Sequence, residues 1–296
     1  RRPMQWPEIG RLCAAVVPGA GNVDISAVGA GLFSETYRVA RDGIAYTLKV
    51  AATHRPDLRV DLPWEVRVLE HAGSAGLAPR VVYFDLERAV LLTRWVQGRA
   101  WISQEARTAE NLQRIAELLR RVHALAVPLP VRLVSPLQWI EIYAEALSQR
   151  KAHAADPALR RAALVRTQAL VELPPAMGVV CHSDLHAMNL LQEGEALVLL
   201  DWEYAHVTDP LWDLAGWCAN NDLEADLQWR LLGDYLGREP ISREWQRLKL
   251  LLALYDYVCL LWSQLYLSVR GEAAAPVAER ARLLDARLRV PAHYAA

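Results

Sequence analysis

Three polar residues stand close together at residues 181–189, in the pattern His-x-Asp-x-x-x-x-Asn: they are His182, Asp184 and Asn189. An acidic residue, Asp201, ends an apolar run shortly afterwards. Phosphoryl transfer needs an aspartate that orients and deprotonates a hydroxyl group. It also needs an amide oxygen and a second carboxylate that hold Mg²⁺ on the phosphates of ATP. Asp184, Asn189 and Asp201 fit these three roles, so their spacing predicts phosphoryl transfer.

The residues around this loop favour a structured site. Apolar runs at residues 178–181 and 196–200 have the composition of short buried strands, which would bring the three polar groups to one edge of a folded unit. The alternative is a solvated loop whose Asp and Asn residues have no chemical role. The flanking strands favour the catalytic interpretation.

Length and composition indicate a globular protein with two lobes. A chain of 296 residues exceeds the usual size of one compact unit, and its 53% hydrophobic and 23% charged residues are typical of an enzyme. With 33 basic and 34 acidic side chains, the net charge of -1 predicts no nucleic-acid partner and no attraction to an anionic membrane.

Cysteines and apolar segments give expectations about the compartment. The four cysteines lie far apart in apolar surroundings, which predicts core thiols and neither disulfides nor a zinc site. The start of the chain lacks the apolar run of a secretory signal. Residues 248–262 form the most apolar long segment, but Lys249 and Asp256 interrupt it. We expect a soluble, cytoplasmic protein without membrane insertion; the sequence does not determine its oligomeric state.

The pattern of apolar residues predicts an α+β fold. Five antiparallel strands are expected, three within residues 23–50 and two at residues 80–84 and 89–93, with a helix at residues 61–73 packed on them. Long helical patterns follow at residues 108–125, 137–153, 157–172, 210–220, 223–236, 243–269 and 275–288. We therefore expect a nucleotide-binding lobe at residues 1–96 and a helical lobe at residues 97–296 that carries the catalytic loop and substrate site, with a cleft between them.

A lysine in the first lobe is placed to contact ATP. Lys49 follows a glycine-bearing hairpin on a strand, from which its ammonium group can reach the phosphates. Glu65, on the first-lobe helix, is the expected ion-pair partner, and Glu70 on another face of that helix is the alternative.

Two further segments are candidates for nucleotide contacts. Gly29 and Gly31 occupy the place of a phosphate-covering loop, although a hairpin that needs two glycines explains them nearly as well. Adenine is expected to bond to the backbone of Arg94, Trp95 and Val96.

These motifs resemble those of the aminoglycoside phosphotransferase and choline kinase superfamily, a branch of the protein-kinase-like fold. The resemblance covers residues 29–262. Its most specific segment, residues 199–215, looks like the metal-binding segment of bacterial choline/ethanolamine kinases and thiamine kinases, where protein kinases carry Asp-Phe-Gly. The resemblance implies a bilobal fold, ATP and Mg²⁺ as cofactors, and a small-molecule alcohol as substrate.

The resemblance also implies roles for individual residues. Asp184 would be the catalytic base, and Asn189 and Asp201 would be the Mg²⁺ ligands. His182 would brace the catalytic loop, and Asp213 would anchor the backbone of that loop. A further residue, His186, matches thiamine-kinase-like and aminoglycoside-kinase-like loops and is a candidate substrate contact.

Aromatic residues give the main indication of the substrate. The chain has 11 tryptophans and 10 tyrosines but only 2 phenylalanines, and several cluster in the helical part: Trp202, Tyr204, Trp212, Trp217, Tyr255 and Trp262. Aromatic faces attract quaternary cations, although tryptophans at helical spacing also fill cores. Choline kinases typically carry two tryptophans three residues apart on the late helix. Trp262 takes the second place here and Cys259 the first, and residues 262–272 look closer to thiamine kinase.

We therefore expect phosphorylation of a cationic primary alcohol such as choline, ethanolamine or thiamine. An aminoglycoside or sugar kinase is the first alternative, for which a carboxylate-lined pocket would be needed; candidates are Glu203, Asp209, Asp222, Glu224 and Asp226. A catalytically silent nucleotide-binding regulatory module is the second alternative.

Overall fold

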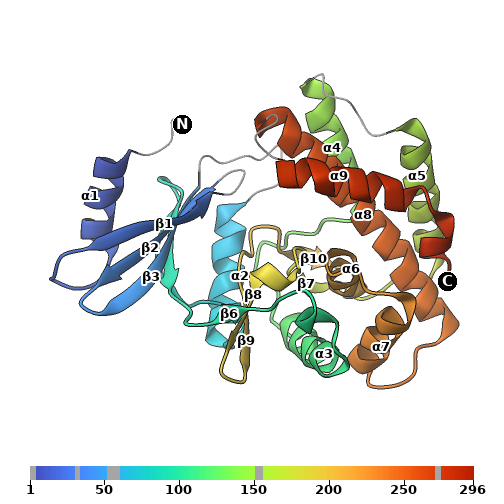
Figure 1. Ribbon diagram of the computed structural model, residues 1–296, viewed down its shortest axis with the longest axis horizontal. Helices are drawn as coiled ribbons and strands as arrows, with labels where there is room; N and C mark the ends of the chain where they lie inside the picture. Colours follow the sequence, from blue (N-terminus) through green and yellow to red (C-terminus); the bar gives the residue numbers. More distant parts are fainter. Residues whose placement is uncertain (1–4, 31–33, 52–60, 151–155, 271–274) are drawn as a thin grey trace. The chain divides into compact units, whose positions relative to one another are not determined.

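The computed structural model describes residues 5–30, 34–51, 61–150, 156–270 and 275–296, which form an α+β structure (Figure 1). The chain divides into two compact units. Of the described residues, the first comprises 5–30, 34–51, 61–100 and 190–203, and the second comprises 101–150, 156–189, 204–270 and 275–296. The first unit thus includes a short segment from the second half of the chain, residues 190–203.

A five-stranded antiparallel sheet forms the centre of the first unit, which confirms the predicted fold class. The strand order is β1-β2-β3-β5-β4. The strands are β1 (Asp24–Ala30), β2 (Ser34–Arg41), β3 (Ile44–Ala51), β4 (Val81–Asp85) and β5 (Val90–Arg94). Helix α1 (Trp6–Val16) packs on one face, where Leu48 and Val50 are buried. Because side chains alternate along a strand, Lys49 lies on the opposite face.

Helix α2 (Leu62–Ser74) begins where local signals predict a helix start. The Asp61 side chain accepts a hydrogen bond from the Trp64 amide at 3.1 Å, and Pro63 lies in the first turn. This start places Glu65 in the first turn of α2, where it is only 3% exposed.

A second, three-stranded sheet completes the first unit. It consists of β6 (Arg99–Ala100), β8 (Leu190–Glu193) and β9 (Ala196–Leu199), in the order β6-β8-β9. The Leu199 amide donates to the carbonyl oxygen of Leu77 at 2.8 Å. This bond ties the β8–β9 hairpin to the segment that follows α2.

The second unit is mainly helical, also as predicted. Its helices are α3 (Ala109–His123), α4 (Pro136–Gln149), α5 (Pro157–Glu172), α6 (Leu211–Asn220), α7 (Ala225–Leu236), α8 (Ser242–Arg270) and α9 (Ala275–Leu288). Short 3-10 turns occur at η2 (Glu105–Arg107), η3 (Ala187–Asn189) and η5 (Pro291–Tyr294). Strand β7 (Val179–Cys181) pairs with β10 (His206–Thr208). The end of the helix expected at residues 137–153 lies outside the described residues.

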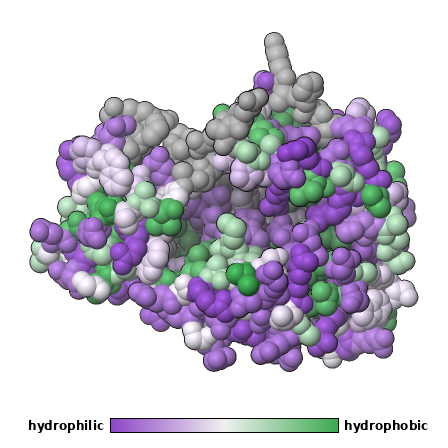
Figure 2. All heavy atoms as spheres, viewed as in Figure 1, coloured by the Kyte–Doolittle hydropathy of each residue, from purple (hydrophilic) through white to green (hydrophobic). Residues whose placement is uncertain are grey.

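Helix α8 is the central element of the second unit and packs against α4, α5, α6 and α9. It is long and apolar enough to cross a membrane by length and composition alone, over Ser242–Val269. However, 61% of the apolar window is buried inside the protein, so packing against other helices accounts for its composition. Hydrophilic and hydrophobic residues are interspersed on the face shown in Figure 2.

Candidate active site

Three carboxylates surround one ammonium group in the first unit. The Nζ atom of Lys49 lies 3.0 Å from an oxygen atom of each carboxylate. The three belong to Glu65, Asp201 and Glu203. Glu65 is the partner that the sequence favoured, whereas the alternative, Glu70, is exposed. We call these four residues the Lys49 cluster.

Burial and charge act in opposite directions on the pKa values of the Lys49 cluster. Burial alone would lower the pKa of Lys49, but the charges of Asp201, Glu203 and Glu65 outweigh it and raise this pKa well above its usual value. Burial raises the pKa of Glu203 to about 7, although the charge of Lys49 opposes the shift. When all members are ionised, the cluster carries excess negative charge, which a divalent cation offsets.

The other predicted nucleotide contacts that the structure describes lie at or near the ends of strands in the five-stranded sheet. Gly29 lies in β1 next to a register shift in its pairing with β2, and Gly31 lies outside the described residues. Arg94 ends β5, and its guanidinium group lies 5.1 Å from the centre of the Tyr46 ring. The Trp95 amide donates to the Ala45 carbonyl oxygen at 3.2 Å. Val96 follows directly, with its backbone outside the strand.

A buried aspartate fixes the backbone of the loop that carries Asp184. Asp213, on α6, is 0% exposed; its Oδ2 accepts from the His182 amide at 2.8 Å and its Oδ1 from the Ser183 amide at 2.7 Å. Burial would raise the pKa of Asp213, but the hydrogen bond and charge of His123, followed by other groups including the Ser183 amide, hold it below its usual value. Bonds from amides to a carboxylate are stronger than neutral ones, so Asp213 is a firm anchor.

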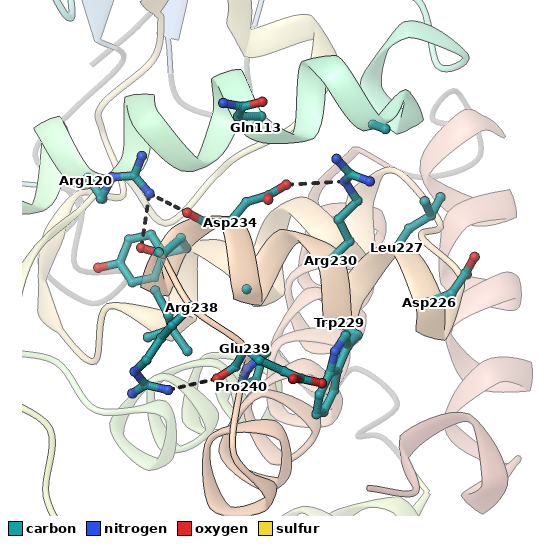
Figure 3. A pocket seen from close by; sticks show the side chains of 15 residues that line it. Gln113, Arg120, Asp226, Leu227, Trp229, Arg230, Asp234, Arg238, Glu239 and Pro240 are labelled. Atoms are coloured by element: carbon teal, nitrogen blue, oxygen red, sulfur yellow. Dashed lines mark hydrogen bonds and ion pairs between the residues drawn. The ribbon is translucent and has the colours of Figure 1, made fainter.

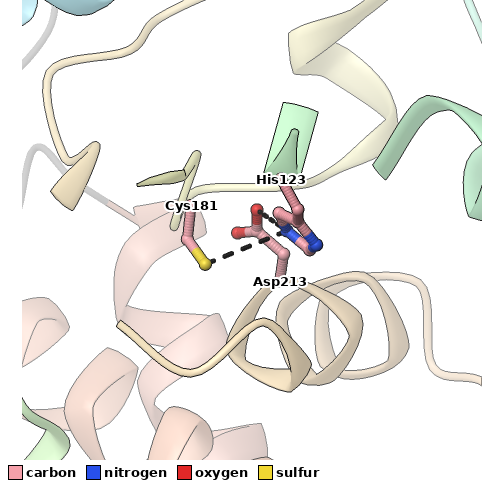
Figure 4. Close-up of side chains that lie close together, drawn as sticks. All are labelled: His123, Cys181 and Asp213. Carbon is pink, nitrogen blue, oxygen red and sulfur yellow. Dashed lines mark hydrogen bonds and ion pairs between the residues drawn. The ribbon is translucent and has the colours of Figure 1, made fainter. Parts of the chain in front are cut away.

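His123 and Cys181 lie beside Asp213 (Figure 4), and the potential ligand atoms of the three lie within 4.8 Å of one another. His123 Nε2 lies 3.2 Å from Asp213 Oδ2, and its Nδ1 lies 2.8 Å from the Tyr235 hydroxyl, so both ring nitrogens are engaged. Burial raises the pKa of the Cys181 thiol well above its usual value, whereas metal binding needs the thiolate. We interpret the cluster as support for Asp213 and not as a metal centre.

Asp184 itself is oriented by neighbouring side chains. Asn189 Nδ2 donates to the carbonyl oxygen of Asp184 at 3.0 Å and to its Oδ2 at 3.1 Å, so the amide oxygen of Asn189 remains as the acceptor. His186 Nε2 lies 3.7 Å from Asp184 Oδ2, and His182 Nδ1 accepts from the Asp184 amide at 3.3 Å. Burial would raise the pKa of Asp184, but the hydrogen bond and charge of His186 outweigh it and lower the pKa. Asp184 is therefore ionised at neutral pH.

Two residues of the candidate site have left-handed backbone: Ser183, which precedes Asp184, and Asp201 itself. The φ angles of Ser183 and Asp201 are 70° and 58°. Such angles are uncommon outside glycine and cost about 1–3 kcal/mol each, a cost that is typical of functional sites.

In the β8–β9 hairpin, Leu190 pairs with Leu199. Because Asn189 precedes the first of these and Asp201 closely follows the second, both residues lie at the same end of the hairpin.

Asp184 and His186 line a cavity of about 160 Å³ in the second unit, which we call the aromatic cavity. Its aromatic residues are Trp139, Tyr143, Tyr204, Trp212, Tyr255 and Trp262. The rings of Trp139 and Tyr143 stack at 5.5 Å, and Trp262 Nε1 donates to the Tyr204 hydroxyl at 2.8 Å. The cavity is smaller than the about 300–1,000 Å³ of pockets for drug-sized ligands, so it suits a small molecule.

The aromatic cavity differs in part from the predicted aromatic cluster. Trp202 and Trp217 are 0% exposed, and their indole groups donate to backbone oxygens, so they are core residues and do not line the cavity. Sequence reasoning missed Trp139 and Tyr143, whose spacing on α4 places them on one helix face. It also missed Arg280 of α9, which lines the same cavity.

The five carboxylates that suited an aminoglycoside do not gather at the aromatic cavity. Glu203 belongs to the Lys49 cluster. Asp209 Oδ2 lies 2.6 Å from Arg247, and Asp222 Oδ1 lies 2.9 Å from Arg287. The remaining two, Glu224 and Asp226, lie at the start of α7.

A larger hollow of about 1020 Å³ lies against α3 and α7 (Figure 3). Each of its three arginines has a partner: Arg120 donates to the carbonyl oxygen of Asp234, Arg230 pairs with the carboxylate of Asp234, and Arg238 pairs with Glu244 outside the hollow. No residue of the Asp184 loop lines it. The aromatic cavity is therefore the candidate active site, although it is the smaller of the two.

Comparison with known proteins shows the family of the chain. The sequence profile described as "phosphotransferase enzyme family" matches residues 24–251, more than half of the chain. The chain belongs to the phosphotransferase enzyme family. The match includes Lys49, Asp184, Asn189 and Asp201, and it ends within α8.

Two solved structures and one curated protein illustrate the relationship. A choline/ethanolamine kinase family protein from Mesorhizobium loti is 24% identical, with a TM-score of 0.77 over 97% of this chain and 94% of that one. The choline kinase LicA from Streptococcus pneumoniae is 21% identical, with a TM-score of 0.77 over 95% and 97%. These likenesses establish the protein-kinase-like fold. Protein LicA of Haemophilus influenzae is 24% identical over 66% of this chain, and the match spans only 57% of that protein.

Proposed function

We propose that this member of the phosphotransferase enzyme family is a Mg²⁺- and ATP-dependent kinase that phosphorylates the hydroxyl group of a small molecule. The observation that carries the proposal is the position of Asp184. Its ionised carboxylate is hydrogen-bonded by Asn189 and lines a small cavity with mainly aromatic walls. In this position an aspartate can accept the proton of a bound alcohol.

Other residues of the chain orient Asp184 and bind the phosphates of the nucleotide. Asp213 and His182 hold the loop so that Asp184 keeps its orientation, and the Lys49 ammonium is held in place by Glu65. We assign Lys49 to the phosphates of the nucleotide. Its carboxylate partners keep it protonated, because they raise its pKa.

The donor groups fit Mg²⁺. This cation prefers carboxylate and amide oxygens, and the Asn189 amide oxygen and the Asp201 carboxylate lie at the same end of the β8–β9 hairpin. Asp201 is the most exposed carboxylate of the Lys49 cluster, at 45% of its side chain. When bound, ATP supplies the phosphoryl group and Mg²⁺ offsets its charge.

A solved LicA structure that is 19% identical to this chain contains AMP. We also assign the backbone of Gly29, Arg94, Trp95 and Val96 to nucleotide contacts.

For the substrate, we propose a small alcohol that carries a cationic group, with choline, ethanolamine and thiamine as the first examples to test. Six aromatic side chains line the aromatic cavity, and aromatic faces attract cations. The dispersed positions of Asp209, Asp222 and the other candidate carboxylates give an aminoglycoside less support.

The test is a thermal-shift screen followed by ADP release. Mg²⁺-nucleotide would be combined with choline, ethanolamine, thiamine, an aminoglycoside and amino sugars, because a bound ligand stabilises the folded state. Asp184→Ala should lower turnover by about 10²–10⁴-fold, because general-base catalysis is lost. Nucleotide binding should persist in this variant.

Asp226→Ala, which removes an exposed carboxylate of the same unit, serves as the matched control and should retain turnover. Undiminished turnover in Asp184→Ala would contradict the assignment of the base. Nucleotide binding by the wild type without turnover of any alcohol would support the silent regulatory module instead.

A further inference from the structure

Arg280, on α9, brings a permanent positive charge to the wall of the aromatic cavity. A guanidinium group stays protonated at every physiological pH. The other wall residues with a charge near neutral pH are Asp184 and, when protonated, His186. The cavity thus combines aromatic faces with one carboxylate and one guanidinium. The proposed reaction uses the carboxylate of Asp184 as the base, but it assigns no role to the guanidinium of Arg280.

Neutral groups hold Arg280 in place. Its Nη2 donates to Asn220 Oδ1 at 2.6 Å, and it also contacts the Cys259 side chain. Burial raises the pKa of the Cys259 thiol to about 11, so this thiol is neutral. Asn220 in turn donates to the carbonyl oxygen of Leu185, in the same loop as Asp184. The guanidinium is therefore positioned relative to the catalytic loop without losing its net charge.

Other arginines of α9 are paired differently. Arg287 pairs with Asp256 and Asp222, and Arg282 pairs with Glu279. In the part of the chain that the structure describes, no carboxylate lies within ion-pair distance of Arg280. A partly buried charge without an opposite charge is costly, and a bound anion would remove this cost.

We propose that Arg280 binds an anionic group of the acceptor substrate, such as a carboxylate. The substrate is then a dipolar alcohol, with its cation on the aromatic faces and its anion on Arg280. Because Arg280 and Asp184 line the same small cavity, one small molecule can carry both the anion and the hydroxyl group whose proton Asp184 accepts. This inference rests on the proposed kinase function and narrows its substrate class.

Matched pairs of alcohols that differ by one carboxylate test the inference. Serine is ethanolamine with an added carboxylate, and homoserine is 3-aminopropan-1-ol with the same addition. We expect kcat/KM to be higher for the carboxylated member of at least one pair by about 10- to 100-fold, as for one charge-assisted hydrogen bond. Arg280→Gln should abolish this ratio, and Arg280→Glu should invert it.

The exposed Arg282→Gln, on the same helix, is the matched control and should keep the wild-type ratio. Calorimetry of the same pairs with a non-hydrolysable nucleotide gives the preference independently of turnover. A preference for the carboxylate-free member, or no carboxylate-dependent binding in either pair, would overturn the inference. So would Arg280→Gln lowering kcat equally for both members, because that result would place Arg280 at the transferred phosphoryl group. Kinase activity towards ethanolamine alone would leave the proposed function standing and remove only this inference.

Discussion

The Lys49 cluster and the Asp184 loop hold their polar groups in different ways. In the Lys49 cluster, side chains from β3, α2 and the segment after β9 meet through hydrogen-bonded ion pairs, and three carboxylates share one ammonium. In the Asp184 loop, the side chain of Asp213 accepts hydrogen bonds from two backbone amides. His123 contacts Asp213, and Tyr235 contacts His123.

This difference shows how each region can respond to a ligand. A carboxylate that shares an ammonium with two others can turn toward a metal ion without leaving a buried group unpaired. A backbone that is bonded to a buried carboxylate cannot shift without breaking those bonds. We therefore expect the Asp184 loop to be preorganised and the Lys49 cluster to rearrange when Mg²⁺-nucleotide binds. Four measurements test whether the two regions differ in this way.

The largest effect is expected when the anchor is removed. Asp213→Ala leaves the His182 and Ser183 amides and His123 without their buried partner, so the free energy of unfolding should fall by about 3–5 kcal/mol. Urea denaturation measures this change. Asp285→Ala, which breaks the exposed pair with Arg289, should cost less than about 1 kcal/mol. Equal losses in the two variants would contradict the role of Asp213 as an anchor.

A smaller loss, which depends on pH, is expected in the Lys49 cluster. Lys49→Gln leaves three carboxylates facing one another, which should cost about 1.5–3 kcal/mol at pH 8. The loss should shrink at pH 5.5, because the carboxylates can then take up protons. In the second unit, Lys249 is bonded to neutral groups, the side chain of Gln228 and the carbonyl oxygen of His293, and its pKa is lowered by burial. Lys249→Gln should therefore show no such recovery at acid pH, and a similar recovery in both variants would argue against charge as the basis of the Lys49 cluster.

The third measurement concerns Glu203 alone. Its pKa is raised from 4.5 to about 7 in the folded protein, so the folded state binds the proton more tightly than the unfolded state. Stability from this group is complete below pH 4.5 and is lost as pH rises to about 7, with a slope of at most about 1.4 kcal/mol per pH unit. Glu203→Gln should flatten the stability profile in this window. An unchanged slope would place the proton on another group.

The smallest effect is expected behind the anchor. Tyr235→Phe removes the hydroxyl that lies 2.8 Å from His123 Nδ1, which should cost about 0.5–1.5 kcal/mol. The control is Tyr83→Phe on β4, whose hydroxyl has no hydrogen bond to another described residue, and this variant should be neutral. A neutral Tyr235→Phe would mean that Asp213 needs no support from His123.

Local sequence patterns predicted most of the elements. The alternation of apolar and polar residues in β3 and the helix cap at Asp61 depend only on neighbouring residues. The antiparallel sheet and α2 could therefore be predicted from the sequence. The choice of Glu65 over Glu70 followed from the helical period. The spacing of Asp184 and Asn189 was enough to predict that these side chains lie close together, because the hydrogen bond between them spans only five residues.

Contacts between distant segments could not be predicted in this way. Arg280 reaches the aromatic cavity because α9 packs on α8, and no local pattern determines that packing. His123 contacts Asp213 from a helix 90 residues away in sequence. Trp202 has the same residue type as the tryptophans of the cavity, but it is fully buried and its indole group donates to the carbonyl oxygen of Leu199.

The β8–β9 hairpin makes the first unit a discontinuous assembly, with consequences for dissection and for genetic exchange. A fragment that ends at Ala100 would lack the strand that pairs with β6 and two of the three acids around Lys49. We therefore expect that such a fragment does not fold on its own, and recombination that exchanges the first unit between homologues without residues 101–189 would need three crossovers.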